Sequence, residues 1–411
     1  MPHKRLRQSN TRGGYLAPEL DYGTSKAVVG GDQVFIEGCT GLTLDGEGFV
    51  GKGDPEAQAE QAMETVRILL EEAGVKMEDI CLINNYTTNW EDRAKVYPVI
   101  AKHLQGVNPV STGLIVKSLA EPYIDFEIDV WTVIPNDRDQ GHERMRLANP
   151  KGGYLMPTLD FGNARVIRAN DHLFLQGQTG MSLDGKAFEG EGDPGKQADV
   201  AMENVKELLA DAGATLQDIC KITIYLTDPS HRSAIYPVLS KHLEGVHPVV
   251  TTTVVKGLAR SELNFEIDVF AYLTEPGENG IQRYGVGESS DLLGQECPLS
   301  TTVRAGRFLF LPAQSGMYPD GNGLIGRGDV AAQADQAMKN VSAMLKEAGS
   351  SVEDICKVTT YVKNQAARAM VYPEMGKHLK GVYPTSTGLV VEELSSPELD
   401  FEIDVFAVTS D

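Results

Sequence analysis

Three glutamates stand at equivalent places in a repeated pentapeptide, and they are the residues best suited to proton transfer. Phe-Glu-Ile-Asp-Val surrounds Glu127, Glu266 and Glu402, with spacings of 139 and 136 residues. A carboxylate in a semi-buried site has a raised pKa and can move protons to and from water. The alternative is a structural carboxylate that accepts hydrogen bonds from backbone N–H groups. The sequence leaves both roles open.

Three tyrosines repeat in the same way, at Tyr97, Tyr236 and Tyr372. A tyrosine hydroxyl can donate a hydrogen bond to a substrate carbonyl, and its ring can stack on a flat ligand. The same side chain can instead anchor a domain interface, with its ring buried and its hydroxyl near water. Of the two roles, the sequence favours the anchor.

Three histidines also repeat, at His103, His242 and His378, each in the tripeptide Lys-His-Leu near the end of a predicted helix. A cationic side chain there interacts favourably with the helix dipole. One histidine per repeat on an outer helix gives no cluster of ligands, so we expect no metal site.

The five cysteines do not indicate a disulfide framework, because their number is odd and no CxxC motif occurs. Cys81, Cys220 and Cys356 share one repeat position, where a small buried residue at a strand start is expected. Cys39 follows Gly38 beside the presumed site. A nucleophile needs an activating base, and with no histidine partner evident we favour a passive residue.

The repeats set the domain organisation of the 411-residue chain. We place three copies of one domain at residues 13–135, 152–275 and 284–409, each large enough to bury a core. Two short polar segments, 136–142 and 275–280, link them. The preceding residues, 1–12, are polar and are predicted to form a flexible or wrapping arm.

Each copy shows the same order of elements, illustrated by the first. Gly30-Gly31-Asp32 predicts a hairpin turn before a strand at 33–38. Asp54 is a helix N-cap and Gly74 a C-terminal glycine, with one apolar face between them. A second helix is predicted at 90–104, and Pro98 predicts that its regular part begins near Tyr97 or that it is kinked there. The remaining strands are predicted at 80–88, 111–116 and 123–133.

This order predicts an α+β fold with one mixed sheet and both helices on one of its faces. Alternation along the last strand turns Phe126, Ile128 and Val130 to the helices and Glu127 and Asp129 to the open face. The other two copies are the natural cover for that face. We therefore expect a closed body with pseudo-threefold symmetry.

Composition restricts the partners. The net charge of −21 argues against a phosphate-binding surface and so against nucleic acid. No apolar run reaches the length of a membrane span, and the basic N-terminus is followed by no apolar segment of a secretory signal. We expect a cytoplasmic protein without membrane or nucleic-acid partners that acts on a small molecule.

Several motifs recur in the copies. They are Gly-Asp-x-Val/Leu-Phe-Ile/Leu-x-Gly-x-Thr-Gly, the Gly-Asp-Pro helix start, the Glu-Ala-Gly helix end, Asp-Ile-Cys-Lys-Val/Ile-Thr and the closing Phe-Glu-Ile-Asp-Val. Together they resemble the RidA/YjgF superfamily of reactive-intermediate deaminases, also labelled endoribonuclease L-PSP. The combination is specific, although no single motif is. The resemblance covers the three copies nearly end to end.

The resemblance implies a chorismate-mutase-like fold. Members of this family are homotrimers with outer helices, an inner β-barrel and ligand clefts between subunits. Active members hydrolyse enamines and imines, typically 2-iminoacids, to ketoacids and ammonia without a cofactor. This chain resembles such a trimer fused into one polypeptide, which is compatible with a monomer; the sequence leaves further association open.

The family's site residues transfer only in part. Its glutamate that positions water matches Glu127, Glu266 and Glu402, and its second site position matches Tyr97, Tyr236 and Tyr372. The threonine of the Pro-x-Arg-Ser/Thr segment matches Thr112, Thr251 and Thr387; the glycine matches Gly38 and Gly177 but is Ala313 in the third copy. An aromatic residue is carried over to Tyr22 and Phe161 only as candidates.

The family's carboxylate-binding arginine is replaced in every copy, by Ser111, Val250 and Ser386. Serine cannot replace a charged fork, and valine has no polar group. We therefore expect a hydrolase or deaminase whose substrate lacks a carboxylate at that place, with the glutamates as general acid/base. The alternative is a non-catalytic metabolite-binding or scaffold protein on the same fold.

Overall fold

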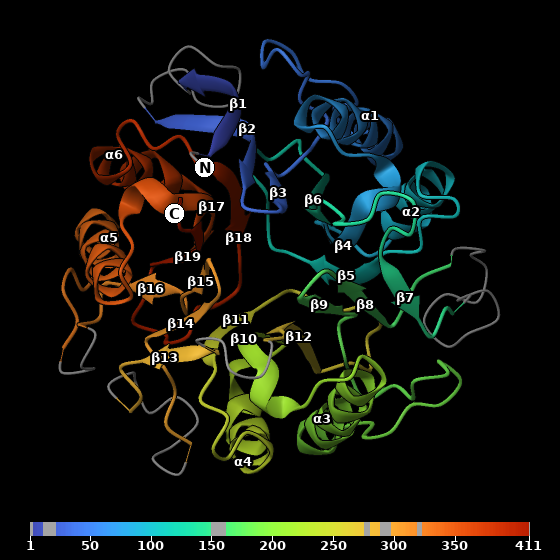
Figure 1. The fold of residues 1–411 in the computed structure, drawn as a ribbon. Helices are drawn as coiled ribbons and strands as arrows, with labels where there is room; N and C mark the ends of the chain where they lie inside the picture. Colours follow the sequence, from blue (N-terminus) through green and yellow to red (C-terminus); the bar gives the residue numbers. More distant parts are fainter. Residues whose placement is uncertain are drawn as a thin grey trace.

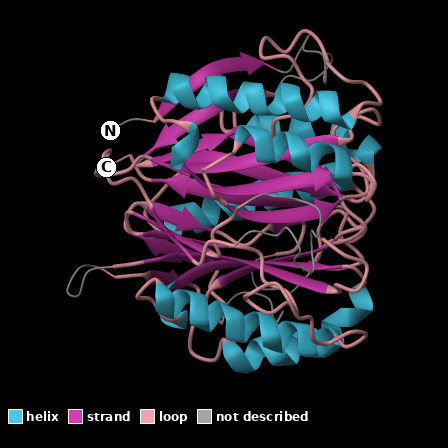
Figure 2. Ribbon diagram, turned by 90° about the vertical axis from the view of Figure 1, so that its right-hand side faces the viewer, coloured by secondary structure: helices cyan, strands magenta, loops and turns pink. Residues whose placement is uncertain are grey.

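The computed structural model describes residues 3–10, 22–148, 162–274, 280–287, 297–318 and 323–410. Three similar units surround a common centre, with helices outside and sheets inside (Figure 1). The side view shows the same layers, with strands between outer helices (Figure 2). None of the helices in the described ranges has the length and apolar character that a membrane crossing needs.

Unit 1 contains one mixed sheet and two helices. Its elements are β1 (Lys4–Asn10), β2 (Gly23–Gly30), β3 (Gln33–Ile36), α1 (Pro55–Ala73), β4 (Ile80–Thr87), α2 (Arg93–His103), β5 (Val110–Ile115) and β6 (Phe126–Val133). The strand order is β1-β2-β3-β6-β4-β5, and only β4 and β5 are parallel. This confirms the predicted α+β unit.

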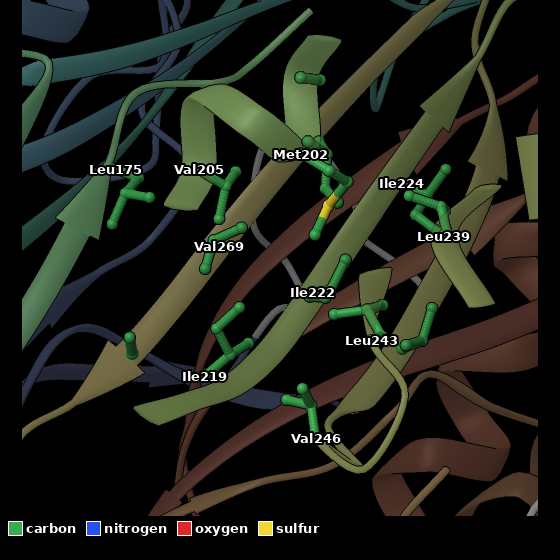
Figure 3. Close-up of a cluster of buried hydrophobic side chains, with 14 of the residues drawn as sticks. Leu175, Met202, Val205, Ile219, Ile222, Ile224, Leu239, Leu243, Val246 and Val269 are labelled. Carbon is green, nitrogen blue, oxygen red and sulfur yellow. The ribbon is translucent and has the colours of Figure 1, made fainter. Parts of the chain in front are cut away.

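Unit 2 repeats this topology. Its elements are β7 (Glu143–Met145), β8 (Val166–Ala169), β9 (His172–Leu175), α3 (Pro194–Asp211), β10 (Ile219–Leu226), α4 (Arg232–His242), β11 (Val249–Val254) and β12 (Phe265–Tyr272). Figure 3 shows the core between helices and sheet, where Met202 and Val205 of α3 lie over Ile222 and Val269.

Unit 3 adds one short strand to the same plan. Its elements are β13 (Gln282–Tyr284), β14 (Thr302–Ala305), β15 (Phe308–Phe310), β16 (Gln314–Ser315), α5 (Val330–Glu347), β17 (Ile355–Val362), α6 (Arg368–His378), β18 (Thr385–Val390) and β19 (Phe401–Val408). The extra strand β16 pairs with β19.

Local sequence explains where the first helix starts and ends. The Asp54 carboxylate accepts a hydrogen bond from the Ala57 N–H at 3.2 Å, so it caps the N-terminus of α1. Gly74 ends α1 with a left-handed φ of 86°, which glycine adopts without steric cost. The other long helices, α3 and α5, begin in the same way after Asp193 and Asp329.

The second helix begins earlier than expected. α2 starts at Arg93, four residues before Tyr97, and Pro98 lies inside it. The alternative of a start near Tyr97 was therefore wrong, the range 90–104 contains the observed helix, and a kink at Pro98 stays a prediction. Val96, Tyr97 and their neighbours are buried in the unit core, and this packing offsets the missing backbone donor of the proline.

The N-terminal residues form a strand that also contacts unit 3. β1 pairs with β2 in antiparallel register. The Arg5 guanidinium donates to the carbonyl oxygens of Tyr383 at 3.0 Å and of Glu353 at 2.9 Å. Arg144 of unit 2 donates in the same manner to the Glu78 carbonyl of unit 1 at 2.7 Å. The wrapping arm is thus what the described residues show.

The open faces of the three sheets pack together, as expected. Trp131, Phe270 and Phe406 occupy one repeat position and meet with ring centroids 4.5 to 5.4 Å apart. The expected inner barrel is not confirmed, because the described strands form three separate sheets joined across units by isolated bridges such as Ile115 to Gly257.

Candidate active sites at the three interfaces

Each repeated glutamate lies where two units meet. Glu127 of unit 1 faces α6 and β18 of unit 3, Glu266 of unit 2 faces unit 1, and Glu402 of unit 3 faces unit 2. We name the interfaces after these residues. All three side chains are buried, with exposures of 4, 4 and 1 %.

Glycine makes room for the carboxyl group at two interfaces. A Cβ built on Gly38 would overlap Oε1 of Glu127 and lie 3.1 Å from Thr387 Oγ1. A Cβ on Gly177 would overlap Glu266 Oε1 in the same way and lie 2.7 Å from Thr112 Oγ1. The predicted glycines, glutamates and threonines therefore meet in space, and each threonine comes from the neighbouring unit.

The carboxyl groups of Glu127 and Glu266 make no hydrogen bond within the described part of the chain. Oε2 of Glu266 is buried without a partner. Burial and the nearby Asp129 raise the pKa of Glu127 to about 8, against the opposing charges of Arg368 and Lys357. Burial and then Asp268 raise the pKa of Glu266 well above its ordinary value. Both shifts favour the protonated form of the carboxyl group.

Glu402 is held differently. The Ser395 backbone N–H donates to its Oε1 at 3.2 Å, and the Ser395 hydroxyl donates to the same oxygen. Burial raises the pKa of Glu402 to about 7, while these hydrogen bonds oppose the rise. The residue equivalent to Gly38 and Gly177 is Ala313, which carries the methyl group that glycine lacks.

An arginine that the sequence interpretation missed stands beside each glutamate. Arg93, Arg232 and Arg368 are the first residues of α2, α4 and α6, four positions before the repeated tyrosines. Arg368 donates through Nε and Nη2 to the Tyr372 hydroxyl at 2.9 and 2.7 Å. Arg93 Nε donates to the Tyr97 hydroxyl at 2.9 Å. The signal was present in the sequence as an Arg-x-x-x-Tyr spacing in every repeat.

These helix arginines lie at the same interfaces where the family's strand arginine is missing from this chain. Ser111 accepts a hydrogen bond from Asn85 at 3.3 Å, and Val250 is buried at 6 % exposure in the core of unit 2. The strand positions thus carry no cation, but Arg93 and Arg368 bring a guanidinium to the same interfaces from a helix.

At the Glu402 interface the arginine is occupied. Arg232 forms an ion pair with Glu393 at 2.6 Å and donates to the Leu394 carbonyl at 2.6 Å. The positions equivalent to Glu393 are Ser118 and Gly257, neither of which is charged. The guanidinium of Arg232 is therefore neutralised within the protein.

The tyrosines also differ between interfaces. The hydroxyls of Tyr97 and Tyr372 lie 2.5 and 2.6 Å from where Gly113 and Gly388 would carry a Cβ. Unit 2 has Thr252 at this position, and the Tyr236 hydroxyl donates to its Oγ1 at 3.3 Å. Thr252 thus fills the space that glycine leaves open elsewhere.

One predicted aromatic residue contributes to a site and the other lies outside the described residues. Tyr22 of unit 1 stacks on Tyr372 of unit 3, with ring centroids 5.6 Å apart and planes at 11°. This places the ring of Tyr22 at the Glu127 interface. Phe161, the second candidate, lies outside the described ranges.

The threonine hydroxyls already have partners. Thr387 donates to Asp129 at 2.5 Å, Thr112 to Asp268 at 2.5 Å and Thr251 to Asp404 at 3.1 Å. Each bond crosses an interface. The threonines therefore fix neighbouring units, and their role towards a ligand stays a prediction.

The cysteines are free and buried. Burial raises the pKa of Cys39 well above its ordinary value, with a further rise from Glu37. A thiol in that state is a poor nucleophile, which supports the passive role. Burial likewise raises the pKa of Cys81, Cys220 and Cys356 to about 12, in line with small buried residues at strand starts.

The histidines connect the two helices of their units, which helix-dipole reasoning did not foresee. His103 contacts Glu60 at 2.7 Å and His378 contacts Asp335 at 2.8 Å. In unit 2, ligand atoms of Asp199, Glu203 and His242 lie within 4.8 Å of one another and could hold a metal ion. Two lysines compete for this group: Lys206 bonds Glu203 at 2.8 Å, and Lys196 lies 3.6 Å from Asp199.

Comparison with known proteins identifies the family. The sequence model described as Endoribonuclease L-PSP matches residues 16–134, 161–273 and 291–409. The chain belongs to this family. The three matches confirm the resemblance to RidA/YjgF proteins and the tandem repeat.

Individual relatives match one repeat at a time. A RutC family protein of Pyrococcus abyssi is 37 % identical over 67 residues, which are 16 % of this chain and 52 % of the relative. The chain thus spans about half the length of that relative. A RutC family protein of Pyrococcus horikoshii is 32 % identical over 110 residues, which are 27 % of this chain and 86 % of the relative.

A solved structure of another protein matches most of the chain. A chorismatase crystal structure superposes with a TM-score of 0.54 and 12 % identity, covering 80 % of this chain and 93 % of the other. At this identity the likeness concerns the fold alone. It shows that the three-unit arrangement is shared with another protein.

Proposed function

We propose that the chain is a cofactor-independent hydrolase that releases ammonia from small enamines and imines at the Glu127 and Glu266 interfaces. The observation that carries this proposal occurs twice. A buried carboxyl group without a hydrogen-bond partner lies beside an arginine and a tyrosine of the neighbouring unit. A raised pKa favours the protonated form of this group, which is the form that a general acid needs.

The proposed reaction uses the glutamate twice. The protonated carboxyl group gives its proton to the β-carbon of an enamine, which becomes an iminium ion. The carboxylate then takes a proton from water while the water oxygen bonds to the iminium carbon. That proton then returns to nitrogen, and as the carboxylate takes the proton of the added hydroxyl group the carbon–nitrogen bond breaks, which releases ammonia, leaves a carbonyl product and restores the protonated carboxyl group. The net change is addition of one water and loss of one ammonia.

Arginine and tyrosine would hold the substrate. Arg93 or Arg368 can bind a carboxylate or carbonyl oxygen through charge-assisted hydrogen bonds. The hydroxyls of Tyr97 and Tyr372 accept from these arginines and so keep their own proton for a substrate oxygen. The helix arginine can take the place of the family's carboxylate-binding arginine, which this chain lacks on the strand. We therefore revise the substrate class to enamines and imines that carry a carboxylate near the reacting carbon.

The comparisons support this proposal at the level of family and fold. Active RidA/YjgF proteins carry out this chemistry, and a protein named chorismatase uses the same three-unit arrangement. The net charge of −21 gives no support to the ribonuclease activity in the family description.

The test is ammonia release from enamines and imines generated in situ, with carboxylate and carboxylate-free substrates side by side. We expect turnover of the carboxylate compounds. Glu127→Gln and Glu266→Gln should each remove part of the activity, and the double variant should lose about 10²- to 10⁴-fold. Glu402→Gln is the matched control and should keep the activity.

Other outcomes would redirect the assignment. Turnover of carboxylate-free compounds alone would contradict the binding of a substrate carboxylate by Arg93 and Arg368. Full activity of the Glu127→Gln, Glu266→Gln double variant would contradict the glutamate mechanism. Binding of these compounds without turnover across the panel would favour the metabolite-binding or scaffold protein.

A further inference from the structure

The aspartates of the repeated pentapeptide lie behind the glutamates. Asp129, Asp268 and Asp404 follow them by two positions, so each pair points to the same face of its strand. All three aspartates are buried, at 2 to 3 % exposure. Besides its threonine, Asp129 accepts from the Tyr86 hydroxyl at 3.3 Å and Asp268 from the Tyr225 hydroxyl at 3.1 Å.

Two of these aspartates are each neutralised by a lysine from the neighbouring unit. Lys357 Nζ lies 3.0 Å from Asp129 Oδ1 and also donates to the Ile36 carbonyl at 3.0 Å. Lys221 Nζ lies 2.7 Å from Asp404 Oδ1. Both lysine side chains are 1 % exposed. Each pair is therefore a buried ion pair with further hydrogen bonds, the arrangement that tolerates burial.

The third aspartate has no such partner among the described residues. The position equivalent to Lys357 and Lys221 is Leu82, which is buried at 3 % exposure. The recorded hydrogen bonds of the Asp268 side chain come from two neutral hydroxyls, Thr112 and Tyr225. This difference separates the Glu127 and Glu266 interfaces, because Asp129 stands behind Glu127 and Asp268 behind Glu266.

We propose that the exchange of lysine for Leu82 makes the Glu266 interface work to higher pH than the Glu127 interface, where Lys357 places a buried positive charge. This inference rests on the proposed function and names Lys357 and Leu82 as residues that act through the neighbouring glutamates. The protein would then carry out one reaction over a wider pH range than a symmetric trimer can.

The charged groups around each glutamate agree with this difference. Glu127 faces Asp129 on its own strand, Lys357 on β17, Arg368 on α6 and Glu37 after β3. Glu37 is itself paired with Lys26 at 2.6 Å.

Glu266 faces only Asp268 and Arg93 as charged neighbours within the described ranges. The position of Glu37 is taken by Gln176, which carries no charge. Burial raises the pKa of Asp268 to about 6, so at neutral pH Asp268 is mostly ionised and adds an uncompensated negative charge. That charge disfavours ionisation of Glu266.

Single-site backgrounds allow the test. Glu266→Gln leaves the Glu127 interface active, and Glu127→Gln leaves the Glu266 interface active. Activity that depends on a protonated glutamate falls as the pH rises through the pKa of that glutamate. We expect the profile of the Glu127→Gln protein to extend about 1 pH unit or more higher than that of the Glu266→Gln protein.

Two substitutions should then give the Glu266 interface the pH dependence of the Glu127 interface. In the Glu127→Gln background, Leu82→Lys should supply the missing cation and Asp268→Asn should remove the uncompensated charge. Each should lower the alkaline limb of the profile by about 1 pH unit. Leu82→Met is the matched control, because it keeps an uncharged side chain of similar volume, and its profile should not move.

The Lys357→Met protein, in the Glu266→Gln background, should show the opposite shift. It leaves Asp129 buried without its cation, so it can fail to fold. The Leu82→Lys and Asp268→Asn proteins keep the proposal falsifiable in that case.

A readout without turnover separates this inference from the proposed function. NMR titration of the glutamate carboxyl carbons, assigned with the Glu→Gln variants, gives the ionisation midpoints of Glu127 and Glu266 directly. A higher midpoint for Glu266 that falls in Leu82→Lys supports the inference even if no substrate is turned over. Equal midpoints, or a midpoint that Leu82→Lys leaves in place, overturn it.

Discussion

The Glu402 interface and the Glu127 interface have the same ancestry in the repeat but opposite states. At the Glu127 interface, Gly38 leaves space for a carboxyl group without a hydrogen-bond partner. At the Glu402 interface, Ser395 binds the carboxyl group and Glu393 neutralises the arginine. The Glu127 carboxyl group has no hydrogen-bond partner in the described part of the chain, whereas Glu402 has one oxygen bound and its arginine ion-paired within the protein, although Glu402 Oε2 and Arg232 Nε remain buried without a partner there.

Four substitutions distinguish the Glu402 interface, which we call closed, from the Glu127 and Glu266 interfaces, which we call open. They are Ala313 for glycine, Ser395 for alanine, Glu393 for serine or glycine, and Thr252 for glycine. In a trimer of identical chains a change at one interface appears at all three. Fusion of the units removes this constraint, so one interface can gain stability while the others keep unsatisfied polar groups for function.

The largest effect should come from making the open interfaces resemble the closed one. In the Gly38→Ala, Gly177→Ala double variant, each new methyl group overlaps the place of a glutamate oxygen. We expect a loss of about 10²-fold or more in kcat/KM and a destabilisation of about 1–3 kcal/mol. Ammonia release and thermal unfolding measure the two effects.

Ala313→Gly is the control for this comparison, because it makes the reverse change at the Glu402 interface. It should leave kcat/KM unchanged as long as Ser395 still holds Glu402. If the Gly38→Ala, Gly177→Ala protein folds and has normal activity, the position of the carboxyl group is unimportant.

The next largest effect should come from the helix arginines. Arg93→Met combined with Arg368→Met should lower kcat/KM by about 10- to 100-fold for carboxylate substrates, since a hydrogen bond to a charged group contributes about 1.5–3 kcal/mol. Lysine in the same places should not restore the activity, because it lacks the planar fork. Steady-state kinetics on both substrate classes provide the measurement.

Arg232→Met is the matched control for the helix arginines. Its guanidinium is bound to Glu393, so kcat/KM should stay at the level of the unmodified protein. An equal loss in all three arginine variants would argue that these residues support the fold rather than the substrate.

A third prediction concerns stability against pH. The pKa of Glu266 is raised in the folded state above its ordinary 4.5, so ionisation of Glu266 favours the unfolded chain. The stability that the protonated group provides is present at low pH and is lost as the pH rises through its folded pKa. The melting temperature of Glu266→Gln relative to the unmodified protein should therefore increase as the pH rises from the ordinary glutamate pKa towards the raised pKa of the folded state.

Glu47→Gln serves as the control for this titration, because Glu47 is an exposed loop residue. Its melting temperature should follow that of the unmodified protein at every pH. If Glu266→Gln behaves like Glu47→Gln, the carboxyl group of Glu266 is not buried in the way described.

The smallest effect is expected at the closed interface itself. Ser395→Ala removes the hydroxyl donor to Glu402 and keeps the backbone N–H donor, and should cost about 0.5–1.5 kcal/mol of the free energy of unfolding. Activity should not change. Ser396→Ala, one residue further along, is the comparison in denaturant unfolding, and an equal or larger loss there would contradict the role of Ser395.

Much of each unit could be predicted from local pattern. Asp54 and Gly74 marked the ends of α1 because capping depends on residues that are adjacent in sequence. Alternation placed Phe126 and Ile128 in the helix-facing core and Glu127 on the opposite face. The expected helix start near Tyr97 was wrong because packing of a buried helix face outweighed the local cost of proline.

The site divided in the same way. The sequence by itself determined the repeat, the element order and the glutamates, tyrosines and glycines that recur with it. Only the tertiary structure decided that Arg93 and Arg368 face these glutamates, that Ser395 and Glu393 close the third interface, and that Leu82 leaves Asp268 without a cation. The reason is physical: these groups meet across interfaces between units, where they are distant in sequence, and local periodicity reports only which face of its own element a residue occupies.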